Sequence, residues 1–331
     1  MEVTNNNPPD NKNQLEVNKN YRKWAPIIVL LVLCGFFSII NPRFLDPWNF
    51  ARLLSSAAIP MVICMGATFI IILGSIDLSI EGILAITGVS ISLMVSNDFS
   101  NLDWGYLGVP IAIGVGGFIG FLNGYFHVKL KTPSFMTTLG FGFACIGIST
   151  LVLSGWTVRI SDRAFRAIYL ERIGGLPIAV WIALAAVLLA YFIEQRTQIG
   201  RWIYAIGGDE EVSKNLGVPI TKTRIISFTI AGLFCGLAGV LSAAQLGQGH
   251  ALMGSGRLFL TITSVVLGGT ALSGGKGSVL NTVVGVLIVV VVNNGMIIMG
   301  IPSFIQQGVQ GLLIIVAVTL ALDRTRLTIV K

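Results

Sequence analysis

The chain has 331 residues, of which 54% are hydrophobic and 11% charged, and its net charge is +7. A soluble domain of this length needs far more charged side chains to cover its surface, so the composition excludes an ordinary soluble protein. The apolar residues form long blocks, each close to the roughly 20 residues that a helix needs to cross a bilayer. We therefore expect an all-α polytopic membrane protein, because the alternating pattern of the other spanning structure, a closed barrel, is absent.

The chain begins with a polar, Asn-rich stretch, residues 1–23, that lacks the basic start and cleavage site of a secretory signal. We expect this stretch to be a disordered cytoplasmic tail. Ten spans are predicted after it, at residues 24–40, 57–73, 80–96, 109–126, 134–154, 178–194, 226–244, 258–272, 278–300 and 304–322. Several are short, which predicts tilted, broken or half-crossing helices. The bundle, residues 24–323, forms one domain, and residues 324–331 form a cytoplasmic C-terminal tail.

Ten spans place both termini on one side of the membrane, and the distribution of Lys and Arg decides which side. With both termini in the cytoplasm, 15 of the 22 Lys and Arg residues lie in cytoplasmic segments. The exception is the outer loop of residues 155–177, which holds Arg159, Arg163, Arg166 and Arg172. A short amphipathic helix on the membrane surface would account for it. The net charge then reflects anchoring to membrane lipid and gives no reason to expect nucleic acid as a partner.

Small residues at four-residue spacing predict where helices pack closely. Lipid gives helices no hydrophobic drive to associate, so close backbone contact does more of the work. One such ladder is Gly116, Gly120 and Gly124, and the span from residue 226 has two further faces, Gly232 with Gly236 and Ala231 with Cys235 and Gly239. The four cysteines and two histidines are scattered singly, so the sequence predicts neither a redox pair nor a metal site.

Two acidic residues, Asp77 and Glu81, lie between two apolar blocks in LGSIDLSIEGILAITG, residues 73–88. An ionised carboxylate at mid-bilayer costs about 2.5–3.5 kcal/mol on insertion scales, so it seldom faces lipid. Three interpretations are open. The first is a cytoplasmic turn in which Asp77 or Ser79 caps the third span. The second is a buried partner for a Lys or Arg, and the third is a proton or cation site.

Polar amides also occur inside apolar blocks, at Asn123, Asn293 and Asn294. Such side chains either bond one helix to another or line a wet cavity. Helix adhesion is the more common of these two roles.

The glycine-rich stretch LGGTALSGGKGS, residues 267–278, is not a phosphate-binding loop. Thr270 stands where the G-x-x-x-x-G-K-[ST] template requires its first Gly, and Gly277 follows Lys276 where the template requires Ser or Thr. The motifs of serine hydrolases, zinc proteases, kinases and EF-hands are absent as well. We therefore expect no cofactor in this chain, so that any ATP and Mg must be bound by another subunit.

The segment AIGGDEEVSKNLG, residues 205–217, is charged and helix-prone, and it lies between two long apolar stretches. Asp209 predicts an N-cap, and Glu210 and Glu211 fall in the first turn, where the helix dipole favours anions. Gly217 predicts the end of the helix. Two interpretations compete: an ordinary solvated loop, and a cytoplasmic element on which a soluble partner docks.

The whole chain after the N-terminal tail resembles the permease subunit of bacterial ribose/xylose/arabinose/galactose-type ABC importers. The resemblance is carried by ordered blocks: LGSIDLSIEGILAITG, GFLNGYFHVKLKTPSFMTTLG, AIGGDEEVSKNLGV, LGGTALSGGKGSVLNTVVG and NNGMIIMGI. Each block is weak alone, and their order and spacing are specific to the family. The sequence departs from the family pattern at Glu81 and at Val212–Ser213, where the family tends to have small residues.

The resemblance implies an ABC importer permease fold in the bacterial inner membrane. It implies a second permease copy, identical or different, a cytoplasmic ABC ATPase subunit and a periplasmic or lipid-anchored sugar-binding protein as partners. It also implies that a coupling loop, at about residues 195–225, docks on the ATPase. The expected coupling residues are Gly207, Gly208, Asp209, Glu210, Glu211 and Gly217.

We therefore expect a non-enzymatic subunit for ATP-driven import of a monosaccharide or related polyol by alternating access. The candidate pathway residues are Asp77, Ser79, Asn123, Thr137, Asn293 and Asn294. One alternative is an ion-coupled secondary transporter that uses Asp77 and Glu81. Another is an ABC permease for a signalling furanone or an amino acid. A membrane enzyme would need a clustered nucleophile, base or metal set, which the sequence lacks.

Overall fold

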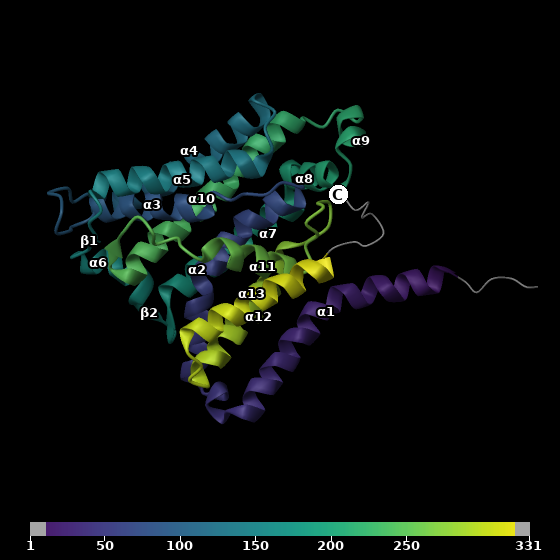
Figure 1. Ribbon diagram of the computed structural model, residues 1–331, viewed down its shortest axis with the longest axis horizontal. Coiled ribbons are helices and arrows are strands. Elements are labelled where there is room, and N and C mark those ends of the chain that lie inside the picture. The colour runs from purple at the N-terminus through teal and green to yellow at the C-terminus, as the bar shows by residue number, and fades with distance from the viewer. Residues whose placement is uncertain (1–10, 322–331) are drawn as a thin grey trace, which may run out of the picture.

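The computed structural model describes residues 11–321 as a bundle of helices with four very short strands (Figure 1). The helices are α1 (Asn11–Ile40), α2 (Pro47–Ile72), α3 (Ile80–Met94), α4 (Gly108–Lys129), α5 (Ser134–Leu153), α6 (Arg163–Leu170), α7 (Ile178–Arg196), α8 (Gln198–Gly208), α9 (Glu210–Asn215), α10 (Ile220–Leu246), α11 (Arg257–Leu267), α12 (Val279–Ile298) and α13 (Ser303–Ala321). Two 3₁₀ turns, Pro42–Leu45 and Gly105–Leu107, precede α2 and α4. The strands are β1 (Val158–Arg159), β2 (Arg172–Ile173), β3 (Leu176–Pro177) and β4 (Gln248–Gly249).

A helix lies at each of the ten positions where the sequence predicts a span. Within the described residues, six of these helices (α2, α4, α5, α7, α10 and α12) are long and apolar enough to cross a membrane. The apolar parts of α1, α3, α11 and α13 are shorter. The structure is therefore that of a polytopic membrane protein, while the number of full crossings and the side on which each terminus lies stay predictions.

Several helix ends differ from the expected ones, and three of them are described here. α2 begins at Pro47, ten residues before its predicted start, because Asp46 caps it through a bond from Trp48 N and Pro47 occupies the first turn. α1 begins at Asn11, so residues 11–23 are helical where the sequence predicts a disordered tail. α11 ends at Leu267, before residue 272. The predicted C-terminal tail, residues 324–331, and residues 1–10 lie outside the described part.

α10 is the centre of the bundle, and its glycines pack against the glycine ladder of α4. The sequence predicted a close crossing at each ladder but not that the two ladders meet. A Cβ placed on Gly120 would collide with the carbonyl oxygen of Phe228, and one placed on Gly232 would collide with that of Gly116. Gly124 lies against Ile225 at the end of the same contact. The two backbones touch, so only glycine fits at these crossings.

The other predicted face of α10 packs on α2 and α3. A Cβ on Gly66 of α2 would come within 2.8 Å of Ala231 Cα, and Gly239 lies against Thr87 of α3. Both small-residue faces are therefore used, which makes α10 a shared wall for α2, α3 and α4.

The chain between α2 and α3, residues 73–79, is not helical, although Asp77 and Ser79 within it are buried. Side chains of α5 satisfy its backbone: Ser134 Oγ accepts the N–H of Ile76 at 3.1 Å, and Thr138 Oγ1 accepts that of Leu78 at 2.9 Å. Non-helical backbone is tolerated inside a membrane protein only where protein groups bond it in this way. This segment is the connection between two predicted spans, and whether any single span is broken stays a prediction.

The opposite end of the bundle holds the arginine-rich loop of residues 155–177. It contains the short amphipathic helix α6, which Asp162 caps by accepting the N–H of Phe165 and which buries Phe165 and Tyr169. β1 pairs with β4, so the loop is fastened to the end of α10. The expected short amphipathic helix is present and carries Arg163 and Arg166, while its place at a membrane surface stays a prediction.

Candidate functional site

The predicted docking helix is present as α9 and follows α8 directly (Figure 1). Asp209 is its N-cap, as predicted, and its Oδ1 accepts the N–H of Val212 at 3.0 Å. Gly217 ends the segment with a φ of +80°, a conformation that favours glycine. Thr197 caps α8 in the same manner by accepting the N–H of Gly200. Both helices are thus set by their own sequence.

The two predicted glutamates of α9 differ in their surroundings. Glu210 forms an ion pair with Arg224 of α10, with Arg224 Nη2 2.6 Å from Glu210 Oε2. Glu211 is exposed. The Glu210 carboxylate therefore holds α9 to α10, whereas Glu211 is available to a partner.

An apolar pair lies beside these charges. Val212 is 53% exposed and Leu216 is 78% exposed, and a spacing of four residues places them on one side of the segment. Exposed apolar side chains on a charged helix outside the apolar blocks indicate a surface that another protein covers. We call Glu211, Val212 and Leu216 the α9 face.

The two predicted glycines at the end of α8 also differ. A Cβ on Gly207 would collide with the carbonyl oxygen of Ile72, at the end of α2, and would lie 2.6 Å from Gly275 N. Gly275 N in turn donates to Ile72 O at 2.8 Å. Gly208 has open space around it. Gly207 therefore faces the bundle, and Gly208 faces away from it.

A buried carboxylate that the sequence analysis did not single out lies beside α8. Glu194, near the end of α7, is 4% exposed. Its Oε1 accepts the hydroxyl of Tyr204 on α8 at 2.5 Å and the N–H of Val279, the first residue of α12, at 3.0 Å. Tyr204 also lies 2.8 Å from Gly277 O. The sequence signal was a single acidic residue inside an apolar span.

Three of the predicted pathway residues form one buried cluster. Asp77 Oδ1 accepts both the N–H and the hydroxyl of Ser79, at 2.8 and 2.5 Å. Asn123 Nδ2 of α4 donates to Ser79 Oγ at 2.8 Å. Asp77 has no ion pair among the described residues, so the Lys or Arg partner is not found. Its two bonds to Ser79 form a local turn before α3, and neither residue makes a side-chain cap bond to α3, so the capping interpretation is not met either.

Glu81 caps a different helix. Its Oε1 accepts the N–H of Leu258, in the first turn of α11, at 3.2 Å. A Cβ on Gly254 would collide with the carbonyl oxygen of Glu81, so the chain before α11 passes directly over the start of α3. Asp77 and Glu81 therefore bond separate backbone groups and share no ligand position in the described structure.

The other predicted pathway residues lie elsewhere. Thr137 bonds locally to Thr132 in the turn before α5. Asn294 exchanges two amide bonds with Asn49 of α2, at 3.1 and 3.0 Å, and Asn293 accepts from Gln310 of α13 at 2.9 Å. These amides join α12 to its neighbours, which is the adhesion role, and they do not continue the Asp77 cluster.

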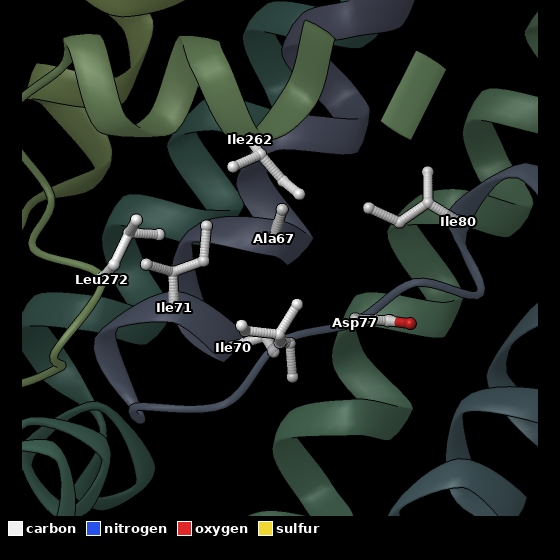
Figure 2. Close-up of a pocket in the computed structure, with 8 residues that line it drawn as sticks. Ala67, Ile70, Ile71, Asp77, Ile80, Ile262 and Leu272 are labelled. Atoms are coloured by element: carbon white, nitrogen blue, oxygen red, sulfur yellow. The ribbon is translucent and has the colours of Figure 1, made fainter. Parts of the chain in front are cut away.

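A small cavity lies beside the Asp77 cluster (Figure 2). It has a volume of about 130 Å³, and its lining consists of Asp77 and seven apolar residues, Ala67, Ile70, Ile71, Ile76, Ile80, Ile262 and Leu272. Pockets for small molecules usually measure about 300–1,000 Å³. Figure 2 shows the Asp77 carboxylate directed away from Ile70, Ile71 and Leu272. We therefore assign no substrate site to this cavity.

Comparison with known proteins adds a family to this geometry. The family model described as a branched-chain amino acid transport system permease component matches residues 49–318. The ribose import permease protein RbsC of Haemophilus influenzae is 32% identical over 295 residues, which are 88% of this chain and 90% of that protein.

Two further relatives cover the chain equally well. RbsC of Bacillus subtilis is 32% identical over 301 residues, 90% of this chain and 92% of its own length. The L-arabinose transport system permease protein AraH of Escherichia coli is 29% identical over 307 residues, 93% of this chain and 92% of that protein. No solved structure matches this chain.

Proposed function

This chain belongs to the family of ABC transporter permease components, and on that premise we propose that it forms the translocation pathway of an ATP-driven importer for a monosaccharide or related polyol. It is a multi-pass subunit of the bacterial inner membrane and not an enzyme. The observation that carries the proposal is the α9 face, exposed on a capped helix between two membrane helices. A chain without a nucleotide-binding motif needs such a surface to receive work from an ATPase.

In this proposal two copies of the permease, identical or different, enclose the pathway, and a cytoplasmic ATPase subunit binds ATP and Mg. Closure of the ATPase pair moves α9 and α8, and the bundle then opens to alternate sides. A sugar-binding protein delivers the substrate to the outer side. The exposed arginines there, including Arg43, Arg159 and Arg163, offer it a charged surface.

The interior polar groups suit a neutral solute that passes without tight binding. Asn123 Nδ2 and the amides of Asn293 and Asn294 already bond protein groups, and Asn123 Oδ1 is buried with no hydrogen-bond partner among residues 11–321. A sugar hydroxyl can donate to such an oxygen when the bundle opens. Selectivity in this scheme rests mainly with the binding protein.

The test is uptake of labelled ribose and arabinose by vesicles that hold the chain with its ATPase and binding protein. We expect uptake that needs ATP and the binding protein, and that persists when an uncoupler removes the proton gradient. Uptake that collapses with the uncoupler while ATP is held constant would instead support ion coupling. Asp77 and Glu81 bond separate backbone N–H groups, of Ser79 and of Leu258, which counts against that alternative.

An amino acid is a second candidate substrate, because the matching family model is described as a branched-chain amino acid permease. The relatives named for ribose and arabinose favour a sugar. Competition separates the two: excess leucine should leave ribose uptake unchanged if the substrate is a sugar.

A further inference from the structure

α8 is joined to three membrane helices. Of the residues that make these contacts, only Gly207 is among the expected coupling residues. The Tyr204 hydroxyl touches Glu194 of α7 and the carbonyl oxygen of Gly277, two residues before α12. The same Glu194 oxygen accepts the N–H of Val279. One carboxylate and one hydroxyl therefore connect α7, α8 and α12.

The third connection is to α2. Gly207 packs its backbone on Ile72 O, which also accepts the N–H of Gly275. The end of α8, the end of α2 and the loop before α12 thus meet backbone to backbone. α8 cannot shift without moving all three, because no side chain lies between them to absorb the displacement.

Glu194 is more than a helix cap needs. A cap requires one acceptor oxygen, which a Gln would also supply. Glu194 instead places a carboxylate at a buried position, with Oε2 lacking any partner in the described part of the chain. Burying such an oxygen costs folding free energy. Stability alone does not explain a carboxylate at this position.

Tyr204 supplies the matching donor. Burial, and after it the hydrogen bond with Glu194, raise the pKa of Tyr204 well above its ordinary value, so its hydroxyl keeps its proton. That single proton faces two acceptors, Glu194 Oε1 at 2.5 Å and Gly277 O at 2.8 Å. A small rotation of α8 transfers the bond from one acceptor to the other without leaving the hydroxyl unpaired.

We propose that Glu194 and Tyr204, with the backbone of Gly277 and Val279, form a latch that passes the movement of α9 and α8 on to α7 and the start of α12. The inference rests on the proposed function. Both side chains are positioning residues, since neither touches substrate or nucleotide. The two acceptors of Tyr204 give the latch its two positions.

The experiment uses the full complex in vesicles and measures uptake of labelled ribose or arabinose and release of phosphate on the same sample. Tyr204→Phe keeps the ring and removes the hydroxyl. We expect the ATPase to remain bound and uptake per ATP hydrolysed to fall at least about fivefold, the factor that one net hydrogen bond of ~1 kcal/mol represents. Glu194→Ala should produce the same loss, and Glu194→Gln, which keeps an acceptor, a smaller one.

Tyr191→Phe is the matched control, because Tyr191 lies on α7, is 40% exposed, and has no hydrogen-bond partner in the described structure. It should leave uptake per ATP unchanged. If the role of Tyr204 is purely structural, Tyr204→Phe should lower the amount of assembled complex and its melting temperature while uptake per ATP hydrolysed stays unchanged. That result would overturn the latch. If the complex with Tyr204→Phe does not assemble, uptake per ATP hydrolysed by the Glu194→Gln complex decides instead.

The wild-type complex separates the two claims. If it takes up no sugar when ATP is supplied, the proposed function fails and the latch fails with it. If the wild type transports and the Tyr204→Phe and Glu194→Ala variants stay within about twofold of its uptake per ATP, only the latch is rejected.

Discussion

At the residue scale, three acids inside this bundle, two of them buried, accept backbone N–H groups at or just before helix starts. Asp77 bonds the N–H of Ser79 before α3, Glu81 that of Leu258 in α11, and Glu194 that of Val279 in α12. Free N–H groups and the helix dipole make a helix start the natural place for an anion, more so where little water competes. An acid inside an apolar span is therefore not by itself a proton or ion site.

The two bonds that Asp77 accepts from Ser79 give a direct prediction. Asp77→Asn keeps an oxygen that accepts from Ser79, so uptake and stability should stay close to those of the wild type. Asp77→Ala loses both bonds and should lower the free energy of unfolding by about 1–2 kcal/mol. Thermal unfolding in detergent and uptake in vesicles measure the two effects. A folded Asp77→Asn protein without uptake would show that the charge itself is required.

Sequence reasoning offered capping by Asp77 or Ser79 as one of three interpretations, left Glu81 without a partner and did not single out Glu194. Asp77 and Ser79 are two residues apart, so the pattern of a local turn is visible in the chain. Glu81 and Leu258 are 177 residues apart, and Glu194 and Val279 are 85 apart. Such pairs leave no periodic or local signal. They depend on how the helices pack, which one sequence does not reveal.

At the element scale, close packing of α10 against α4 determines the arrangement of the bundle. The spacing of the glycines predicted a close crossing on each of these helices, because four residues return to one side of a helix. The partner of each ladder had to come from the structure, since several helices carry small residues at that spacing. The sequence showed the segment at residues 73–79 only as the junction between two predicted spans. That this segment is partly buried and bonded by α5 came from the structure.

The α4–α10 contact can be tested with a matched pair on α4. Gly120→Ala should destabilise the protein by about 1–3 kcal/mol, because the added Cβ meets the backbone of Phe228. Gly114→Ala has open space and should be neutral or slightly stabilising. Melting temperatures in detergent measure both. Equal effects of the two substitutions would refute the contact.

The attachment of α9 to α10 is a second property at this scale. Glu210→Lys should release α9 by placing a cation beside Arg224, and the double variant Glu210→Arg with Arg224→Glu should restore much of the loss. Hydrogen exchange of the α9 amides reports the release, and binding of the ATPase reports its consequence. If the reversed pair performs no better than Glu210→Lys alone, the ion pair does not hold α9.

At the scale of the whole molecule, the chain is a conduit whose energy enters through a small exposed surface. Val212→Ser with Leu216→Ser removes the apolar part of the α9 face and should weaken ATPase binding at least tenfold, since buried apolar side chains dominate protein interfaces. Leu102→Ser, at another exposed leucine in the segment before α4, is the control. Binding measured with purified ATPase should separate the two. Unchanged binding of the double variant would place docking elsewhere.

The most direct measurement reconstitutes the chain in vesicles alone, with the binding protein, and with both the binding protein and the ATPase. We expect labelled sugar to accumulate above its outside concentration only in the complete mixture, only with ATP, and not with the Val212→Ser, Leu216→Ser variant. Accumulation against a gradient by the chain alone would contradict the account, because it would show an energy source within the permease itself.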